Sequence, residues 1–208
     1  MPTILLIRHG ENDFVKKHRL AGRLPGVHLN SKGRQQAQAI AEKLRDAPIK
    51  AIYSSPLERA IQTAEPLAEV LGLPVTPRPG LIETDCGDWS GHSWKKLGRL
   101  KIWRIVQSAP SLFRFPGGET FAESQLRICQ ELQTLSSQHD PKDLIACFSH
   151  ADPIRMAVAF FIGLPLDQFQ RLSVSPASLT VLHISENSSR LLTLNYDLSF
   201  SLSSPPPK

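Results

Sequence analysis

The sequence predicts an α/β fold with a mainly parallel central sheet that helices cover on both faces. Short apolar runs rich in β-branched residues alternate along the chain with longer segments of helical periodicity, which is typical of strand-helix units. The last two apolar runs follow each other without a helix between them. We therefore expect one of these two strands to be antiparallel and to lie at an edge of a mixed sheet.

Five apolar runs are expected to be strands, at residues 4–8, 51–54, 144–149, 179–184 and 191–196. Five periodic segments are expected to be helices, at residues 32–46, 57–71, 93–106, 121–137 and 152–162. With 208 residues, of which 41% are hydrophobic, the chain can bury one sizeable core, so residues 1–198 are expected to form a single domain. The C-terminal residues 199–208 are rich in Ser and Pro and are expected to be disordered.

Local signals mark two of the helix starts. Ser55 is expected to cap the second predicted helix, with a proline at its first position and Glu58 completing a capping box. Thr120 and Glu123 repeat this pattern at the fourth helix. Pro66 lies inside the second predicted helix and is expected to kink it or split it.

Composition narrows the classes of partner. A formal net charge of +5 suits either a phosphate ester or a nucleic acid. Lys and Arg are spread without a block of roughly five or six like charges, so a nucleic acid is not expected. Cys86, Cys129 and Cys147 form no metal-binding motif, which favours a reduced, cytoplasmic protein. No segment reads as a signal peptide or approaches the roughly 18 apolar residues of a membrane helix, so no membrane partner is expected.

Basic side chains follow three of the predicted strands where each strand ends. Arg8 and His9 end the first strand, Arg59 comes shortly after the second, and His150 follows the third. Ligands of open α/β sheets bind beyond the carboxyl ends of the strands. Arg59 lies in the first turn of a helix, where the helix dipole disfavours a cation unless an anion compensates, although a surface ion pair could also account for it. Together the four bases indicate a pocket that binds a phosphate dianion without a metal ion.

Such a pocket could transfer a phosphoryl group. A neutral imidazole is a competent nucleophile toward phosphorus when an acceptor fixes the proton on its other nitrogen. His9, followed by Gly10, suits that role, and Arg8, Arg59 and His150 would neutralise charge on the phosphoryl oxygens.

The leaving alcohol also needs a proton donor. Glu83 follows an apolar pair in a loop rich in Gly and Trp, where burial would raise its pKa and keep it protonated. Asp85 and Asp88 are competing choices, and each of these residues could also be a solvated loop carboxylate.

Several sequence blocks occur in order over most of the chain. They are LIRHGE at 6–11, RLAGRLPGVHLNSKGRQQA at 19–37, YSSPLERAIQTAEPLA at 53–68, LIETDCGDWSG at 81–91, FPGGETF at 115–121 and FSHADPIR at 148–155. Together they resemble the histidine phosphatase superfamily, the phosphoglycerate mutase-like branch 1.

The resemblance implies a three-layer α/β/α fold and a phosphohistidine intermediate, with no cofactor and no metal. It implies that His9 is the nucleophile, that Glu83 rather than Asp85 or Asp88 is the proton donor, and that three residues hold the phosphate. Those three are Arg8, Arg59 and His150.

The chain departs from the family pattern near the expected pocket. Where many relatives carry an Asn that bonds the phosphate this chain has Val15, and Asn12 could supply part of that contact. After His150 many relatives have Gly-Gly, whereas this chain has Ala151 and Asp152. The backbone N–H of Ala151 can still donate, and Asp152 could cap the next helix.

The glycine-containing segment at residues 19–23 lies near the expected mouth of the pocket. Gly22 and Arg23 are candidate substrate contacts. Arg19 and Arg23 could bind a second acidic group of the substrate, or they could be solvent-exposed surface charges.

We predict a phosphatase that acts on a small phosphomonoester. A phosphoglycerate-mutase-type phosphomutase is the alternative, less favoured because the cofactor-dependent mutases of this family are longer, and 208 residues leave little for a lid beyond residues 89–118. A non-catalytic binder of phosphorylated ligands is less favoured still, because binding alone needs no nucleophile and acid together. The sequence leaves a monomer and a homodimer equally open.

Overall fold

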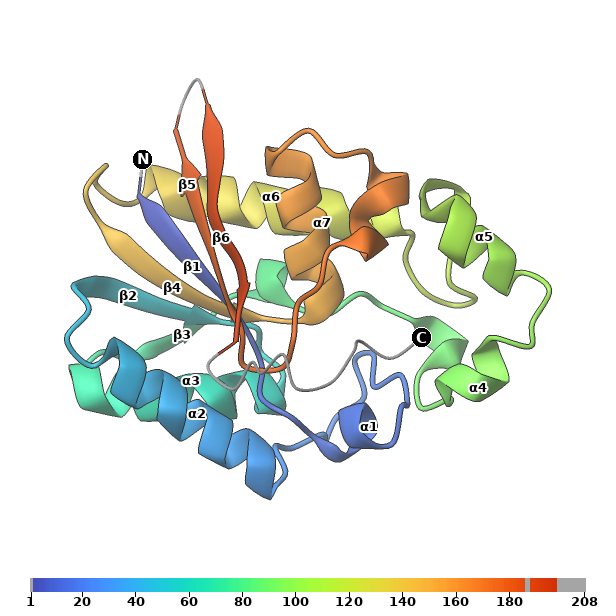
Figure 1. Ribbon diagram of the computed structural model, residues 1–208, viewed down its shortest axis with the longest axis horizontal. Helices are drawn as coiled ribbons and strands as arrows, with labels where there is room; N and C mark the ends of the chain where they lie inside the picture. Colours follow the sequence, from blue (N-terminus) through green and yellow to red (C-terminus); the bar gives the residue numbers. More distant parts are fainter. Residues whose placement is uncertain (1, 186–187, 198–208) are drawn as a thin grey trace.

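One mixed sheet of six strands forms the centre of the molecule in the computed structural model (Figure 1), which describes residues 2–185 and 188–197. The strands are β1 Thr3–Arg8, β2 Ile49–Ser54, β3 Val75–Pro77, β4 Leu144–Ser149, β5 Leu179–Ile184 and β6 Ser189–Tyr196, in the order β3-β2-β4-β1-β5-β6. Strands β3, β2, β4 and β1 are parallel, and β5 is antiparallel to β1. The predicted mainly parallel, mixed sheet is confirmed; the predicted tail at 199–208 lies outside the described residues.

The two ends of the sheet differ from the prediction in detail. The reversed strand is β5, but the edge is formed by β6, because the two make a hairpin in which β6 pairs with β5 alone. At the other edge the short strand β3 was not predicted, since three residues ending in Pro77 carry too little pattern to detect.

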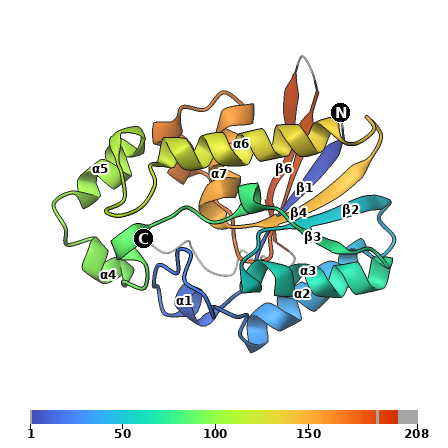
Figure 2. The same cartoon turned by 180° about the vertical axis from the view of Figure 1, so that it is seen from behind.

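The helices are α1 Asp13–Lys16, α2 Ser31–Leu44, α3 Glu58–Leu71, α4 Trp94–Leu97, α5 Trp103–Ser108, α6 Phe121–Ser137 and α7 Ala151–Phe161. Alternate residues of β1 point to opposite faces of the sheet. Leu5 and Ile7 join a core with residues of α2 and α3, whereas Ile4 and Leu6 join a core with residues of α6 and α7. Figure 1 and Figure 2 show these two helix pairs on opposite sides of the strands, so the predicted three-layer α/β/α fold is confirmed.

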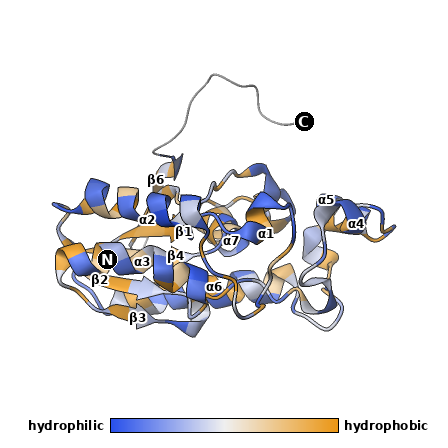
Figure 3. Cartoon of the chain, turned by 90° about the horizontal axis from the view of Figure 1, so that it is seen from below, coloured by the Kyte–Doolittle hydropathy of each residue, from blue (hydrophilic) through white to orange (hydrophobic). Residues whose placement is uncertain are grey.

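A third core lies at one end of the sheet, where the segment between β3 and α6 packs against α6, α7 and the turn at Leu166–Arg171. Its buried members include Trp89, Phe113, Phe115, Phe121 and Phe169. Helices α4 and α5 belong to this segment and project beyond the layered body (Figure 3). No helix among the described residues has the length and apolar character needed to cross a bilayer.

One predicted helix is wrong in extent. Residues 93–106 form the two short helices α4 and α5 rather than one, with Gly98 at the end of α4. A glycine inside a helix costs about 1 kcal/mol relative to alanine, which favours a break at Gly98. Each short helix contributes a tryptophan to one cluster of rings, in which Trp103 of α5 contacts both Trp89 and Trp94 of α4.

Two predicted features of helix α3 are also wrong in part. The helix begins at Glu58, and its N-cap position is Leu57, which makes no side-chain cap. The Ser55 hydroxyl lies before that position, where it accepts from the N–H of Leu57 at 3.3 Å and from His150 at 2.7 Å. The helix also continues unbroken through Pro66, so the predicted split does not occur.

The remaining cap predictions have opposite outcomes. Thr120 and Glu123 form the complete capping box predicted for α6. Asp152 does not cap α7, because His150 occupies the N-cap position and Asp152 lies inside the first turn.

Candidate active site

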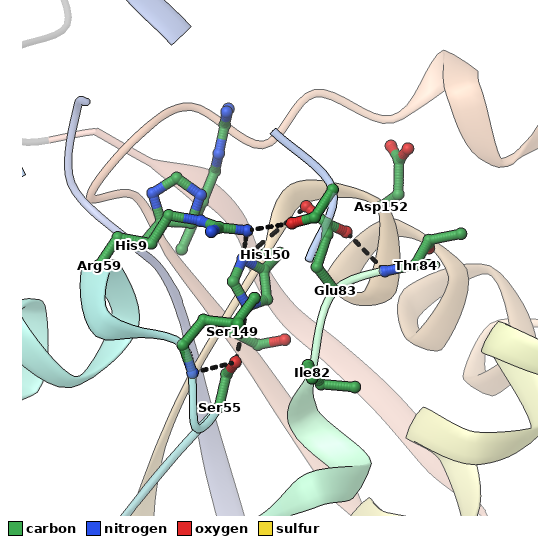
Figure 4. A network of polar contacts seen from close by, with 12 residues as sticks. His9, Ser55, Arg59, Ile82, Glu83, Thr84, Ser149, His150 and Asp152 are labelled. Atoms are coloured by element: carbon green, nitrogen blue, oxygen red, sulfur yellow. Dashed lines mark hydrogen bonds and ion pairs between the residues drawn. The ribbon is translucent and has the colours of Figure 1, made fainter. Parts of the chain in front are cut away.

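The sheet register brings the predicted residues to one edge. Arg8 at the end of β1 pairs with Ser149 at the end of β4, so the next residues, His9 and His150, leave the sheet side by side. The N–H of His9 donates to the carbonyl of Ser149 at 3.0 Å. The two imidazole rings lie 5.1 Å apart between centroids. Figure 4 shows these two rings gathered with Arg59 and Glu83, which arrive from different elements.

His9 is held in one tautomer. Its Nδ1 lies 2.8 Å from the carbonyl oxygen of Gly10, and because a carbonyl can only accept, Nδ1 carries the proton and leaves the Nε2 lone pair free. Burial, together with the cations of Arg59 and Arg8, lowers the pKa of His9 well below its ordinary value. The free imidazole is therefore neutral, which is the state a nucleophile requires.

Arg59 of α3 connects the loop that contains Gly22 to His150 at the start of α7. Its Nη2 donates to the carbonyl of Gly22 at 2.8 Å and lies 3.3 Å from Nδ1 of His150. Gly22 holds a left-handed backbone conformation, with φ of 53°, which glycine adopts without strain. Because Arg59 only donates, Nδ1 of His150 accepts, and its Nε2 donates to the Ser55 hydroxyl at 2.7 Å.

His150 is fully buried behind the cleft. Burial and the nearby Arg59 lower the pKa of His150 well below its ordinary value, and its Nδ1 lies 3.8 Å from a carboxylate oxygen of Glu83. The structure thus places His150 with the other predicted residues, where it fixes Arg59 and faces Glu83.

Glu83 enters the site from the loop that follows β3 and a short turn. One carboxylate oxygen accepts from the N–H of Thr84 at 2.9 Å. Burial, and then the carboxylate of Asp152, raise the pKa of Glu83 to about 7. A carboxyl group with this pKa is partly protonated at neutral pH and can both give and take a proton.

A cleft of about 300 Å³ opens in front of these groups. Arg8, His9, Arg59 and Glu83 line it. Nε of Arg8, and Nε and Nη1 of Arg59, are buried and have no hydrogen-bond partner among the described residues. Such donors are costly to leave unpaired, and a dianion in the cleft would satisfy them.

Asn12 and Val15 both line the cleft. The side-chain oxygen Oδ1 of Asn12 accepts from the N–H of Val15 at 2.9 Å and caps α1, while its Nδ2 is buried and has no partner among the described residues. Asn12 therefore has a donor free for a ligand. Gly22 and Ala151 also line the cleft, and Ala151 begins α7, where the first backbone N–H groups have no partner within the helix.

Arg23 is not among the residues that line the cleft. Its Nε donates to the carbonyl of Glu83 at 2.8 Å, and its Nη2 pairs with Glu119 at 3.0 Å. Arg127 of α6 supports the same loop by donating to the carbonyl of Ile82 at 2.8 Å and to Glu119 at 2.7 Å. The structure thus places Arg23 behind Glu83, where it holds the loop that carries the carboxyl group.

Sequence reasoning missed several residues around the site. The partner of His150 is Ser55, and Arg127 lies on a helix far along the chain, where nothing in the sequence marks it. Arg155 also lines the cleft, and its Nη1 bonds Asp152 at 3.1 Å; the spacing of three residues between Asp152 and Arg155 on a predicted helix was a signal for this pair. Among the described residues, no group of three or more His, Cys, Asp or Glu is placed to hold a metal ion.

The chain matches known proteins over almost its whole length. Residues 4–197 match the family model of the histidine phosphatase superfamily, branch 1. The chain is 29% identical to phosphoserine phosphatase 1 of Hydrogenobacter thermophilus over 94% of this chain and 92% of that protein. It is 29% identical to the 2,3-bisphosphoglycerate-dependent phosphoglycerate mutase of Thermoplasma acidophilum over 93% of this chain and 92% of that protein. A mycobacterial glucosyl-3-phosphoglycerate phosphatase, solved in complex with VO3, superposes with a TM-score of 0.86 at 28% identity, covering 95% of this chain and 100% of that one.

Proposed function

Because the chain belongs to the histidine phosphatase superfamily, branch 1, we propose that it hydrolyses a small phosphomonoester through a phosphohistidine on His9. The observation that carries this proposal is the tautomer of His9. A buried, neutral imidazole whose Nδ1 proton is fixed on the Gly10 carbonyl presents Nε2 to a cleft lined by unpaired cationic donors. That combination suits nucleophilic attack on a phosphoryl group.

In the first half-reaction Nε2 of His9 attacks phosphorus and the bond from phosphorus to the ester oxygen breaks. Protonated Glu83 gives its proton to the leaving alcohol. Arg8 and Arg59 bind the transferred oxygens, with His150 supporting Arg59 from behind. The products are phospho-His9, the free alcohol and ionised Glu83.

In the second half-reaction the ionised Glu83 takes a proton from water as its oxygen attacks phosphorus. The bond between Nε2 and phosphorus breaks, which releases inorganic phosphate and restores neutral His9 and protonated Glu83. A pKa of about 7 suits a group that serves as acid and then as base. Asn12 and the N–H of Ala151 are further donors to the phosphate, and Asn12 would take over the contact that Val15 cannot make.

Phosphate release from a panel of phosphomonoesters tests this proposal. We expect activity in the presence of a chelator, none in His9→Ala, and unchanged activity in His28→Ala, whose exposed imidazole bonds Gln62 away from the cleft. After mixing with substrate and quenching in base, phosphate should be found on His9 and should be lost in acid. Unchanged turnover in His9→Ala, or label confined to a serine or aspartate, would contradict the mechanism.

A phosphomutase remains the second candidate because of the Thermoplasma mutase. The chain covers 92% of that protein, so length does not separate the two activities as expected from the sequence. In a mutase a second hydroxyl of the substrate, rather than water, receives the phosphoryl group. Interconversion of 2- and 3-phosphoglycerate faster than phosphate release would favour the mutase, and release without interconversion would favour the phosphatase.

A further inference from the structure

A second cavity adjoins the phosphate cleft. It has a volume of about 240 Å³ and its walls include Trp89, Trp94, Trp103, Phe115 and Phe121. Neither the phosphoryl-transfer chemistry nor the phosphate contacts require it. An aromatic wall of this kind is typical of a site that binds an apolar group.

The two cavities share part of their lining. Leu20, Trp94, Asp152 and Arg155 line both of them. Asp152 and Arg155 are bonded to each other at 3.1 Å, so the junction is polar. The space beyond it is lined mainly by aromatic and aliphatic side chains, with Gln107 and Gln170 as its other polar residues. A molecule whose phosphate lies beside His9 can therefore extend past Asp152 and Arg155 into the aromatic cavity.

The walls are held in place by ring contacts. The Trp103 ring lies 5.9 Å from Trp89 and 5.9 Å from Trp94, measured between centroids. The Phe115 ring lies 5.2 Å from Phe121 and 5.6 Å from Trp89, and both phenylalanines are buried. Contacts at these separations are favourable for aromatic pairs, so the cavity is formed before a ligand enters.

We propose that this cavity is an aromatic subsite for the leaving alcohol, and that the substrate class is phosphomonoesters of arylalkyl alcohols. The inference rests on the proposed function. An apolar cavity of about 150 Å³ is enough to bind benzene, so the available volume accepts one ring and a short linker. Small polar esters such as phosphoserine would leave the aromatic walls without a partner.

Matched alkyl esters test this inference by kinetics. 3-Phenylpropyl phosphate and propyl phosphate have leaving alcohols of similar acidity, because the ring is remote from the ester oxygen, so they differ in the ring alone. We expect kcat/KM to be roughly 10-fold to 100-fold higher for the phenylpropyl ester, from burial of the ring. Equal kcat/KM values for the two esters would overturn the subsite and leave the phosphatase proposal intact.

Two variants on helix α5 locate the effect. Trp103→Ala should lower the ratio of the two kcat/KM values toward one. Ile105→Ala is the matched control, because Ile105 lies on the same helix, is 41% exposed and does not line the cavity, so its ratio should match the unmodified protein. An equal fall in both variants would mean that disturbance of α5, not loss of the ring contact, sets the preference, and would overturn the assignment.

Binding can be measured without turnover or substitution. The chain has three tryptophans and all of them line this cavity, so intrinsic tryptophan fluorescence reports on it directly. 3-Phenylpropylphosphonate, which has no ester bond to cleave, should bind roughly 10-fold to 100-fold more tightly than propylphosphonate and change the emission more at saturation. Equal affinity and emission would overturn the subsite. Preferential binding of the phenyl compound by a protein that hydrolyses no ester would support the subsite while refuting the phosphatase proposal.

Discussion

Arg59→Met is the substitution that most directly tests how the cleft binds phosphate. The change removes a buried cation from the first turn of α3 while keeping a side chain of similar length. Nε and Nη1 of Arg59 are buried and have no hydrogen-bond partner among the described residues. A hydrogen bond from a charged group contributes about 1.5 to 3 kcal/mol, so two of them to a dianion amount to roughly 3 to 6 kcal/mol. We therefore expect kcat/KM to fall by about 160-fold to 25,000-fold, since each 1.36 kcal/mol is about tenfold.

Arg59→Lys separates charge from geometry. Lysine keeps the positive charge but lacks the planar fork that can bond two phosphate oxygens at once, so its kcat/KM should lie between those of the unmodified protein and the methionine variant. Circular dichroism of both variants checks that they are folded, because the carbonyl of Gly22 and Nδ1 of His150 also lose the donor at Nη2.

The pH profile adds a readout that a purely structural role would not change. Burial lowers the pKa of His9 most, and the Arg59 cation is the next cause. Without this cation the pKa of His9 rises, so the acid limb of kcat/KM should move to higher pH in Arg59→Met but not in Arg59→Lys. A folded Arg59→Met protein that keeps kcat/KM within 10-fold, with an unmoved acid limb, would refute a phosphate-binding role for Arg59.

Four further changes have expected outcomes. Glu83→Gln should lower kcat by at least about 100-fold and abolish the alkaline limb near pH 7, because Glu83 must be protonated to act as the acid and has a pKa of about 7. Asp152→Asn should move that limb to lower pH, because it removes a negative charge that raises the pKa of Glu83; an unmoved limb would assign the shift to burial alone. Asn12→Asp keeps the oxygen that caps α1 but replaces the Nδ2 donor with a carboxylate oxygen that repels the phosphate, so kcat/KM should fall at least about 10-fold; unchanged kcat/KM would contradict a contact between Asn12 and the phosphate. Gly33→Ala should destabilise the protein by about 1 to 3 kcal/mol in urea unfolding, because its Cβ would lie 2.0 Å from the carbonyl oxygen of Glu11; full stability would contradict this close approach.

The fold could be predicted where burial leaves a simple pattern. β1 and β4 lie in the middle of the sheet between two helical layers, so their sequences are continuous apolar runs that end in polar residues. β3 forms an edge and is only partly covered, and such a strand carries no comparable run. The family, its enzyme class and the layered fold were predicted from the ordered sequence blocks and are confirmed by the match over residues 4–197 and by the superposed structure.

The helix errors have a tertiary cause. Ser55 satisfies the local rules for an N-cap, yet the helix begins later, at Glu58, and the Ser55 hydroxyl accepts from His150, 95 positions away, as well as from the N–H of Leu57. Local propensity could not reveal the contact with His150, because this partner is brought in by pairing between β2 and β4. Residues 93–106 have helical periodicity, but the segment is divided at Gly98 into α4 and α5, and residues of both helices line the aromatic cavity.

The candidate site could be predicted to the extent that it follows the ends of strands. His9 and His150 lie next to each other because Arg8 and Ser149 are paired, which the order of the strands implies but a linear sequence does not state. The residues that hold Glu83 in place were not predictable, since Arg127 and Glu119 approach from a separate helix and its preceding loop. Arg23 illustrates the limit, because a basic residue near the pocket mouth can serve the loop that bears the acid instead of facing the cleft.

The burial of the cations also has a consequence for selectivity. Burial lowers the pKa of both Arg8 and Arg59, which means that each guanidinium has lost hydration that its protein contacts do not fully replace. A bound ligand compensates for the lost hydration by placing negative charge and acceptor oxygens beside the unpaired nitrogens, and the compensation grows with that charge and with the number of oxygens. A phosphomonoester offers a dianion with three terminal oxygens, whereas a phosphodiester offers a monoanion with two and an added substituent. We therefore expect the cleft to reject diesters because the buried arginines remain partly unsatisfied, even where the aromatic cavity accepts their ring.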